Sequence, residues 1–378
     1  SSILYLTINA TLDVNATNLT WGIKAYGVYG NETFMSGALS RPIDFVITTN
    51  GVIKAFANGA YLVEARGAAG NFTNIVNSGT ISASASATDG LVTAYGVEAW
   101  DSIGNFTNSG NITASATGGW AVANGVFTLV SIGNFTNSGN ITASASATGG
   151  DAGAAGVVAC STDNFTNSGN ITASATGGRA EAYGVGAGST DNFTNSGNIT
   201  ASATGGMAGA TGVVADSIGN FNNSGTINVY AEGRFNNSTG NFTISSDGVY
   251  IEDSINGFTN EGTIRAIAFA NGIAANSVNI NAFGADLTNL GTFDNKGLIE
   301  VNVKSLYDNS TINAAALNVR NSSNATVTNT GDMVVKLELP TSANMANVNA
   351  AVFYIENSTV TLSNYGNTWV ESNVAGPN

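Results

Sequence analysis

The segment Asn105–Gly119 reads NFTNSGNITASATGG, and the same fifteen residues return at Asn164–Gly178 and at Asn192–Gly206. A fourth copy, at Asn134–Gly150, carries two additional residues. Ile and Ala alternate with hydroxyl side chains in the second half of the segment, and this period of two is typical of a strand with one buried face. Asn-Ser-Gly is a turn signal because Asn and Gly tolerate positive φ. The segment therefore predicts short strands separated by tight turns.

The Asn-x-Gly triplet of this segment recurs from Asn77 to Asn364, at intervals of 28 to 37 residues. A second element of the type Gly-Val-x-Ala lies between successive triplets, as in YGVEA at Tyr95–Ala99. Each repeat thus holds three short strands and three turns, which is the content of one coil of a β-solenoid. The sequence predicts an all-β solenoid of about 11–12 coils, with about 30 residues and three short strands in each coil.

Copies of one coil meet the same environment when they stack, because each neighbour repeats the same residues. Identical side chains then lie about 4.8 Å apart and form ladders. We expect a cap, a first coil or an exchanged strand over residues 1–49, regular coils over 50–233, and longer coils that end in a cap or an assembly edge over 234–378. The predicted core ladders contain Phe106, Phe135, Phe165, Phe193, Ile112, Ile141, Ile171 and Ile199.

The composition argues against several classes of protein. The formal net charge is −14 and no Lys or Arg occurs between Gly67 and Gly178, so we expect no nucleic-acid partner. The chain has no His, which removes the commonest general base and the usual hydrolytic triad. No pair of carboxylates recurs at a spacing that suits acid and base roles, and we therefore expect neither an enzyme nor a cofactor. No apolar run reaches the ~18 residues of a membrane span.

Repeats of the type N-x-G-x-I, followed by alternating small residues, resemble those of autotransporter passengers and filamentous-haemagglutinin-like adhesins. The resemblance covers roughly Gly51–Val370 and implies an extracellular, right-handed β-helix. The acidic chain, its coils rich in Ser, Thr, Asn and Ala, and its many Asn-x-Ser/Thr triplets also look like archaeal surface proteins. Among these are the tubular sheath proteins of methanogens, which stack into β-sheet hoops. Because the chain starts at Ser1 in strand-like sequence, we interpret it as a mature chain without its signal peptide.

The Asn-x-Ser/Thr triplets are acceptor sequences for N-glycosylation in surface proteins. Inside the regular coils their asparagines would stand only about 4.8 Å apart, which is too close for a glycan on every coil. We therefore expect these asparagines to form amide ladders instead. The candidates for glycosylation lie outside the regular block, at Asn9, Asn31, Asn309 and Asn324.

Two further features of the turns have alternative interpretations. Four acidic residues precede the NFTN strands and form a weak candidate Ca²⁺ site, but a solvated turn is the favoured interpretation, since their register alternates and no D-x-D-x-D loop is present. These residues are Asp101, Asp163, Asp191 and Asp216. Cys160 is the only cysteine, so it is a candidate for an intermolecular disulfide, the alternative being an inert, half-buried thiol.

The ends of the solenoid point to a function. Stacked coils leave an unpaired strand edge at each end, and neither end of the sequence carries a helix, a proline-rich plug or a lysine cluster to cover it. The end segments either act as atypical caps or pair with other copies, which gives a filament or a ring. We expect an extracellular structural protein that self-assembles into a cell-surface sheath, filament or layer. The alternatives are an adhesin stalk and, more distantly, a polysaccharide-active enzyme.

Overall fold

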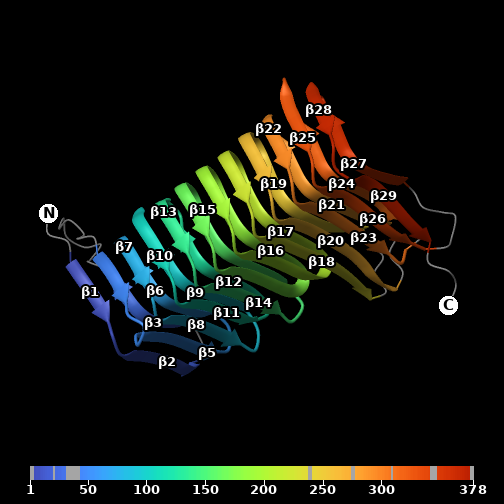
Figure 1. Ribbon diagram of the computed structural model, residues 1–378. Helices are drawn as coiled ribbons and strands as arrows, with labels where there is room; N and C mark the ends of the chain where they lie inside the picture. Colours follow the sequence, from blue (N-terminus) through green and yellow to red (C-terminus); the bar gives the residue numbers. More distant parts are fainter. Residues whose placement is uncertain are drawn as a thin grey trace. The chain divides into compact units, whose positions relative to one another are not determined.

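The computed structural model describes residues 4–19, 22–30, 43–236, 241–273, 277–307, 310–340 and 347–374. These residues form 29 β-strands and contain no helix (Figure 1). The strands wind into a β-solenoid of about 10 coils, each with three strands and roughly 31 residues. The predicted all-β solenoid is therefore confirmed. Within the described ranges, a helix with the length and apolar character needed to cross a membrane is absent.

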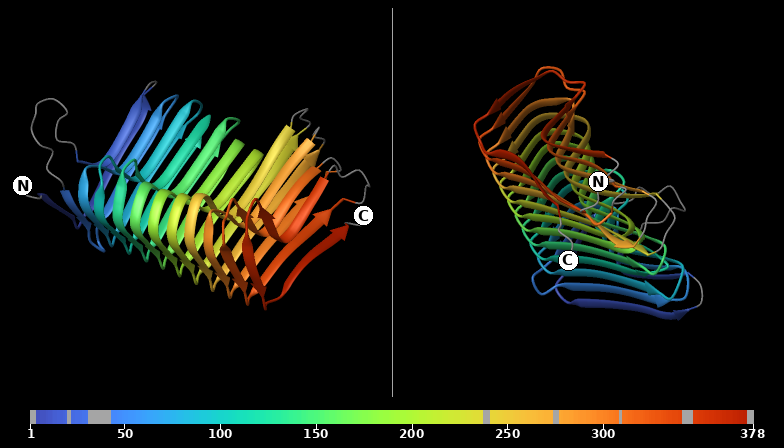
Figure 2. Two further views of the ribbon diagram at one scale, coloured as in Figure 1. Left: turned by 90° about the horizontal axis from the view of Figure 1, so that it is seen from above. Right: turned by 90° about the vertical axis from the view of Figure 1, so that its right-hand side faces the viewer.

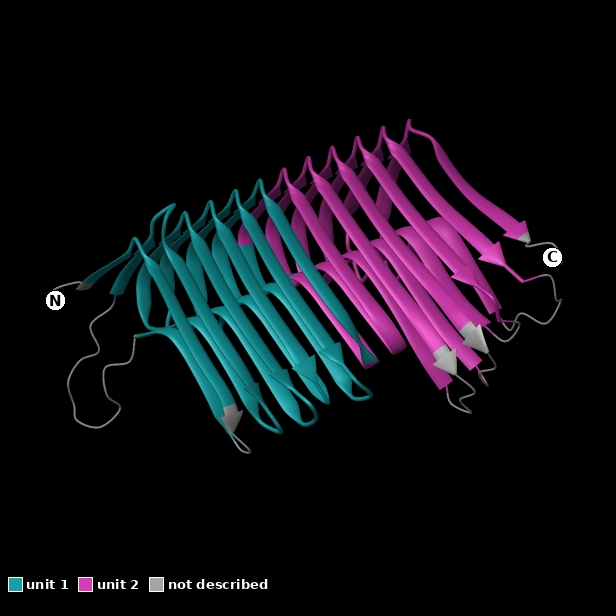
Figure 3. Ribbon diagram, turned by 90° about the horizontal axis from the view of Figure 1, so that it is seen from below, with its two compact units in different colours: residues 1–177, 185–190 teal, residues 178–184, 191–378 magenta. Residues whose placement is uncertain are grey.

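The chain divides into two compact units, which are coloured separately in Figure 3. Unit 1 comprises residues 1–177 and 185–190, and unit 2 comprises residues 178–184 and 191–378. Within each unit, successive coils repeat the same path (Figure 2). Three kinds of strand alternate along the chain, and we name them anchor strands, alternating strands and Gly-Val strands.

Anchor strands from residue 72 onward end at the asparagine of the Asn-x-Gly triplet, and alternating strands follow it. The first two anchor strands occupy the same column without a triplet. The separate anchor strands are β1 (Leu4–Ile8), β4 (Ile43–Ile47), β7 (Phe72–Asn77), β10 (Ile103–Asn108), β13 (Ser131–Asn137), β22 (Leu290–Asn295), β25 (Ala325–Asn329) and β28 (Val360–Asn364). The separate alternating strands are β2 (Thr11–Leu19), β5 (Val52–Gly59), β8 (Thr80–Ala87), β11 (Asn111–Gly118), β14 (Asn140–Ala147), β18 (Thr226–Asn236), β20 (Thr263–Ile273), β23 (Leu298–Ser305), β26 (Asp332–Leu339) and β29 (Thr368–Val374).

Gly-Val strands complete each coil, and most contain the Gly-Val pair. The separate ones are β3 (Ile23–Gly30), β6 (Val63–Gly70), β9 (Leu91–Ala99), β12 (Trp120–Thr128), β21 (Ser277–Thr288), β24 (Ser310–Arg320) and β27 (Asn347–Glu356). In the middle of the chain two or three kinds merge into one long strand, because the turns between them are extended. These long strands are β15 (Asp151–Asn167), β16 (Asn170–Asn195), β17 (Asn198–Asn223) and β19 (Asn241–Asn260).

Strands of one kind pair in parallel and in register, so that each column of the solenoid holds equivalent residues. Phe106 pairs with Phe135, and Ile112 pairs with Ile141. The phenylalanine rings stack face to face, with centroids 5.0 Å and 4.6 Å apart in unit 1 and 5.0, 4.6 and 4.9 Å apart in unit 2. The core of each unit is built from these rings together with Ile, Val and Ala side chains that water hardly reaches.

The asparagine of the Asn-x-Gly triplet forms a ladder inside the core. Asn108 is fully buried, and its Nδ2 donates to Oδ1 of Asn137 at 2.7 Å and to the carbonyl oxygen of Gly110 at 3.3 Å. Equivalent bonds connect Asn223 with Asn260 at 2.8 Å in unit 2. Because each amide has partners on the neighbouring coil, it is buried without the cost of a lost hydrogen bond.

The Gly-Val pair changes the direction in which side chains point. A Cβ at Gly96 would lie 2.5 Å from a methyl group of Ile112 and 2.6 Å from the carbonyl oxygen of Gly125, so only glycine fits there. Val97, the next residue, is also fully buried. Two consecutive inward residues leave Tyr95 and Glu98 on the same outer side of the strand. We call the outer surface at these two positions the groove of the unit.

Candidate functional site

The sequence-predicted glycosylation sites are only partly described. Asn9 is exposed, and its Oδ1 accepts a hydrogen bond of 2.5 Å from Thr48 Oγ1. Asn324 is exposed in a turn, with a φ of 61° in the left-handed region that asparagine tolerates. Asn31 and Asn309 lie outside the described residues. Glycosylation at these four positions stays a prediction.

The asparagines of the regular coils stack in ladders, as predicted. In unit 1, Nδ2 of Asn134 donates to Oδ1 of Asn105 at 2.9 Å, and Nδ2 of Asn164 donates to Oδ1 of Asn134 at 2.9 Å. A second exposed ladder contains Asn111 and Asn140, with a bond of 2.9 Å. These exposed ladders run along the surface beside the buried one, and they use the amides that a glycan would need.

The four acidic turn residues are all exposed, and they do not share one column. Asp163 follows Thr162, which pairs with Ile132, whereas Asp101 precedes Ile103, which pairs with the same Ile132. The two carboxylates of unit 1 are therefore three positions apart in register. Asp191 and Asp216 belong to unit 2. Within the described part of the chain, no group of three or more His, Cys, Asp or Glu residues comes together in a way that could hold a metal ion.

Cys160 lies on the surface of unit 1 as a free thiol. Its Sγ donates to the carbonyl oxygen of Leu129 at 2.9 Å, and its backbone N–H donates to the carbonyl oxygen of Val130. An exposed thiol is accessible to a second molecule, but the intermolecular disulfide stays a prediction. The predicted core residues, by contrast, all lie buried at 0–1% exposure, in the columns described above.

The groove of unit 1 holds a cluster of charges that the sequence did not suggest. Nε of Arg66 lies 2.5 Å from Oε1 of Glu64 and 2.8 Å from Oε2 of Glu98. The guanidinium carbon lies 5.2 Å from the ring centre of Tyr26 and 5.6 Å from that of Tyr95, which are cation–π distances. Register explains the arrangement, because Tyr26, Arg66 and Tyr95 occupy one column.

The groove of unit 2 contains a cavity of about 430 Å³ at the corresponding positions. Asp247 and Phe283 pair in the column that holds Arg66 in unit 1, while Tyr250 and Asp286 pair in the column that holds Glu98. The residues that line the cavity include three carboxylates and three aromatic rings, and neither Lys nor Arg lines it. These six residues are Glu181, Tyr183, Asp247, Tyr250, Phe283 and Asp286.

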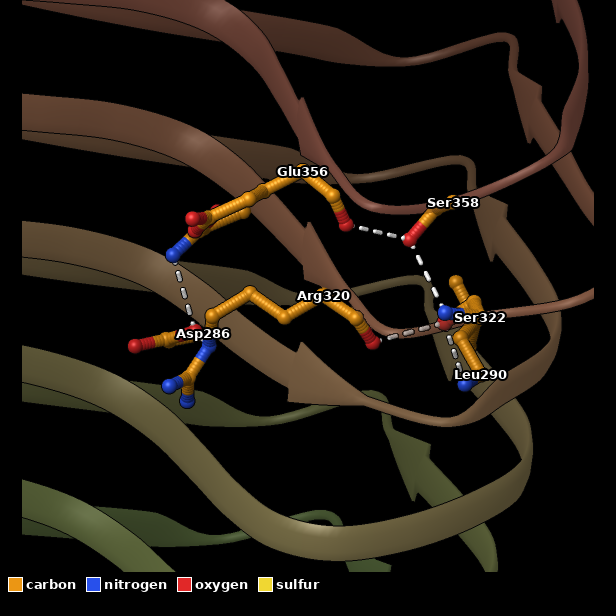
Figure 4. A network of polar contacts seen from close by, with 7 residues as sticks. Asp286, Leu290, Arg320, Ser322, Glu356 and Ser358 are labelled. Carbon is orange, nitrogen blue, oxygen red and sulfur yellow. Dashed lines mark hydrogen bonds and ion pairs between the residues drawn. The ribbon is translucent and has the colours of Figure 1, made fainter.

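A polar network fixes one wall of this cavity (Figure 4). Oδ1 of Asp286 accepts hydrogen bonds from Nδ2 of Asn318 at 3.0 Å and from Nε of Arg320 at 2.9 Å. Oγ of Ser322 donates to the backbone carbonyl oxygen of Arg320 at 3.0 Å and accepts from the backbone N–H of Leu290 at 2.8 Å. Asp286 is thereby held in place by residues of the next coil.

The two aspartates of the cavity titrate at higher pH than usual. Burial raises the pKa of Asp247 to about 7, although the bond from Oγ of Ser245 opposes the rise. Burial also raises the pKa of Asp286 to about 6, against the lowering effect of Arg320. In unit 1, burial raises the pKa of Glu98 despite the neighbouring Arg66. Carboxylates with shifted pKa values that line a cavity are typical of functional sites.

Comparisons with known proteins found no similarity: no protein-family model matches the chain, and neither a curated protein nor a solved structure matches it. The fold therefore defines the class of protein, an all-β solenoid with stacked asparagine and aromatic ladders, and assigns no family.

The groove residues escaped the sequence analysis because they do not repeat. The signal was nevertheless present in the Gly-Val-x-Ala element. In the regular coils the position before the glycine varies among Tyr95, Asn124 and Ala155, whereas Arg66 and Asp247 place charges there. In the other repeats this outward position holds an uncharged residue. A charged residue at that position therefore marks both the Arg66 cluster of unit 1 and the Asp247 cavity of unit 2.

Proposed function

We propose that this chain is an extracellular structural subunit, whose copies associate end to end into a sheath, filament or layer at the cell surface. The single observation that supports this most strongly is the set of strand edges that the outermost described strands leave without a pairing partner. Among the described residues, β1, β2 and β3 pair only with β4, β5 and β6, and β27, β28 and β29 pair only with β24, β25 and β26. Each set leaves one row of backbone donors and acceptors unpaired.

The last coil of unit 2 presents apolar side chains that the core columns would bury. Leu362 pairs with Val327 in the anchor-strand column, yet it is 44% exposed because no described strand pairs with the other edge of its strand. Val370 pairs with Val335 and is 45% exposed for the same reason. Other large side chains on this coil are also exposed, namely Val348, Tyr354, Ile355, Tyr365 and Trp369.

The first coil of unit 1 has a matching edge. Leu12 pairs with Ile53, which is fully buried, but Leu12 itself is 38% exposed. Each edge offers an anchor strand, an alternating strand and a Gly-Val strand, so every strand of one edge has a counterpart of its own kind on the other. A contact between unlike edges is heterologous, and it continues indefinitely unless the assembly closes into a ring.

The experiment measures assembly of the whole chain by sedimentation and negative-stain electron microscopy. Leu362→Lys with Val370→Lys puts two charges on the last edge, and we expect it to abolish ordered polymers, since unpaired charges do not enter a dry contact. Thr113→Lys with Thr142→Lys adds the same charges to the outer face of unit 1 and serves as the matched control. Monomers of the unmodified chain at every concentration, or equal assembly of the two variants, would overturn the proposal.

Exposed Cys160 allows a separate check on how copies hold together. If a disulfide links them, Cys160→Ser loses the linkage seen on non-reducing gels while the ordered assembly persists, because the strand edges are unchanged. Location outside the cell belongs to the same proposal, and its support is the set of exposed acceptor asparagines, Asn9 and Asn324. Mass spectrometry of the native protein tests their occupancy.

A further inference from the structure

The groove of unit 1 shows how this fold accommodates an organic cation. The guanidinium of Arg66 lies between the rings of Tyr26 and Tyr95, and two carboxylates contact its edge. Only 17% of the Arg66 side chain is exposed, so the cation has lost most of its water. Ring faces and carboxylates together replace that water, which is what a desolvated cation requires.

The groove of unit 2 has comparable walls but lacks the cation. Tyr183, Tyr250 and Phe283 supply aromatic faces, and Asp247 stands in the column where unit 1 has Arg66. Among the described residues, Oδ1 of Asp247 is buried without a hydrogen-bond partner, while the same carboxylate accepts bonds from Oγ of Ser245 and from the backbone of Phe283. A buried carboxylate oxygen without a partner is costly, because it has lost its water. A cation that reaches Oδ1 would offset this cost.

Arg320 does not complete the cavity. Its Nε is engaged by Asp286, and its guanidinium carbon lies 5.5 Å from the ring centre of Tyr250. Arg320 forms part of the wall behind Asp286, and it does not line the cavity itself. The two bonds that Asp286 accepts both end on Oδ1, so the other oxygen of this carboxylate is not used by them.

We propose that the cavity of unit 2 binds an alkylammonium group, with the ammonium between the carboxylates of Asp247 and Asp286 and the alkyl chain against Tyr183, Tyr250 and Phe283. The volume of about 430 Å³ lies in the range of small-ligand sites. A compact metal ion fits less well, since no three candidate ligands meet at one point in the described residues. This inference does not depend on the proposed assembly.

The charged and titratable groups around Asp247 make the binding dependent on pH. Because the pKa of Asp247 is raised to about 7, its carboxylate becomes negative between about pH 6 and pH 8. Affinity for an alkylammonium, which stays protonated across that interval, therefore rises with pH. The neighbouring groups that titrate or carry charge are Glu181, Tyr183, Tyr250, Asp286, Arg320 and Glu356.

The test titrates the whole chain with butylammonium and with N-acetyl-lysine methylamide, followed by calorimetry and by NMR of the added ligand. We expect saturable binding at pH 8 that weakens at pH 6, and no binding of butyrate. Asp247→Asn should weaken binding about tenfold, and Phe283→Leu by about threefold to tenfold. Asp216→Asn removes the same charge from an exposed position of unit 2 and should leave affinity unchanged.

Two outcomes would overturn the proposal: no saturable binding of either amine at pH 8, or an equal effect of Asp247→Asn and Asp216→Asn. A further arm separates a free amine from a lysine of a second copy. If the natural occupant is such a lysine, butylammonium dissociates the assembly, and the Asp247→Asn variant does not assemble. If the occupant is a free amine, the assembly is insensitive to both, and binding is equally strong in the Leu362→Lys and Val370→Lys variant.

Discussion

The two units carry opposite charges at the same position of the groove. In unit 1 the column before the glycine carries Arg66, which is balanced by Glu64 and Glu98 and covered by tyrosine rings. In unit 2 the same column carries Asp247, whose Oδ1 is buried without a hydrogen-bond partner among the described residues. The core columns behind both positions are alike. The difference teaches that the inward ladders decide the fold, whereas the outward residues are free to vary and to carry a specific function.

The largest effect is expected in unit 1. Arg66→Met leaves Glu64 and Glu98 close together without their shared cation, so we expect a loss of about 3 kcal/mol in unfolding free energy. Denaturant unfolding followed by circular dichroism measures it. Arg179→Met is the control, because Arg179 is 53% exposed and its pairing with Glu181 stabilises little. Similar losses in the two variants would show that the Arg66 cluster is not a structural element.

The buried asparagine ladder is expected to matter equally in both units. Asn137→Ala in unit 1 and Asn260→Ala in unit 2 each remove one amide from a fully buried chain of amides. Each should cost about 2 kcal/mol, since the neighbouring amides lose partners away from water. Asn134→Ala removes an exposed ladder amide and should cost under about 0.5 kcal/mol. Unequal losses at Asn137 and Asn260 would contradict a common core.

Asp247→Asn should stabilise unit 2, in contrast to Arg66→Met. The folded-state pKa of Asp247 is raised to about 7 from 3.8, so the folded state prefers the protonated acid. The contribution of Asp247 to stability is therefore most favourable at acid pH and falls as the pH rises from about 4 to about 7. Asparagine cannot ionise, and we expect a gain of about 2 kcal/mol at pH 8 that vanishes at pH 3.5.

The control for that change is Asp286→Asn, measured by unfolding over the same pH range. Nε of Arg320 donates to Oδ1 of Asp286, yet the pKa of Asp286 is also raised, to about 6. By the same linkage Asp286→Asn should stabilise unit 2 at pH 8, but by less than Asp247→Asn, because its pKa is raised less. A larger gain for Asp286→Asn than for Asp247→Asn would contradict this order.

The smallest effect is expected on the hydroxyl-rich outer face of unit 1. Thr142→Val replaces one outward hydroxyl and should change the unfolding free energy by less than about 0.5 kcal/mol. It is measured in parallel with Ile141→Ala, the neighbouring inward residue, which should cost about 3 kcal/mol because it opens a cavity in a column of isoleucines. Comparable costs would mean that the inward and outward faces are misassigned.

The sequence was sufficient to predict what repeats. Alternation in the segment after Asn-x-Gly determined which side chains face the core, and the near-identity of the copies determined that Phe106 would stand on Phe135. The exposed amide ladders also followed from repetition. The spacing of the triplets also predicted an end segment, a block of regular coils and a block of longer coils. This division, into residues 1–49, 50–233 and 234–378, stays a prediction.

What the sequence did not reveal depends on register between unlike coils. Arg66 and Glu98 are 32 positions apart, and they meet only because one coil is offset from the next by a definite number of residues. The elevated pKa of Asp247 depends on burial by neighbours such as Phe283, and no local pattern encodes it.

The near-identical coils of unit 1 have a consequence at the level of the gene. The coil that begins at Asn105 presents the same ladder residues to its neighbours as the coil that begins at Asn134. Unequal recombination between two such copies deletes or duplicates one whole coil, and the new junction recreates the amide and ring contacts that were lost. Alleles that differ in their number of coils would then share the same core contacts. The length of the solenoid could therefore vary between alleles while its core residues stay the same.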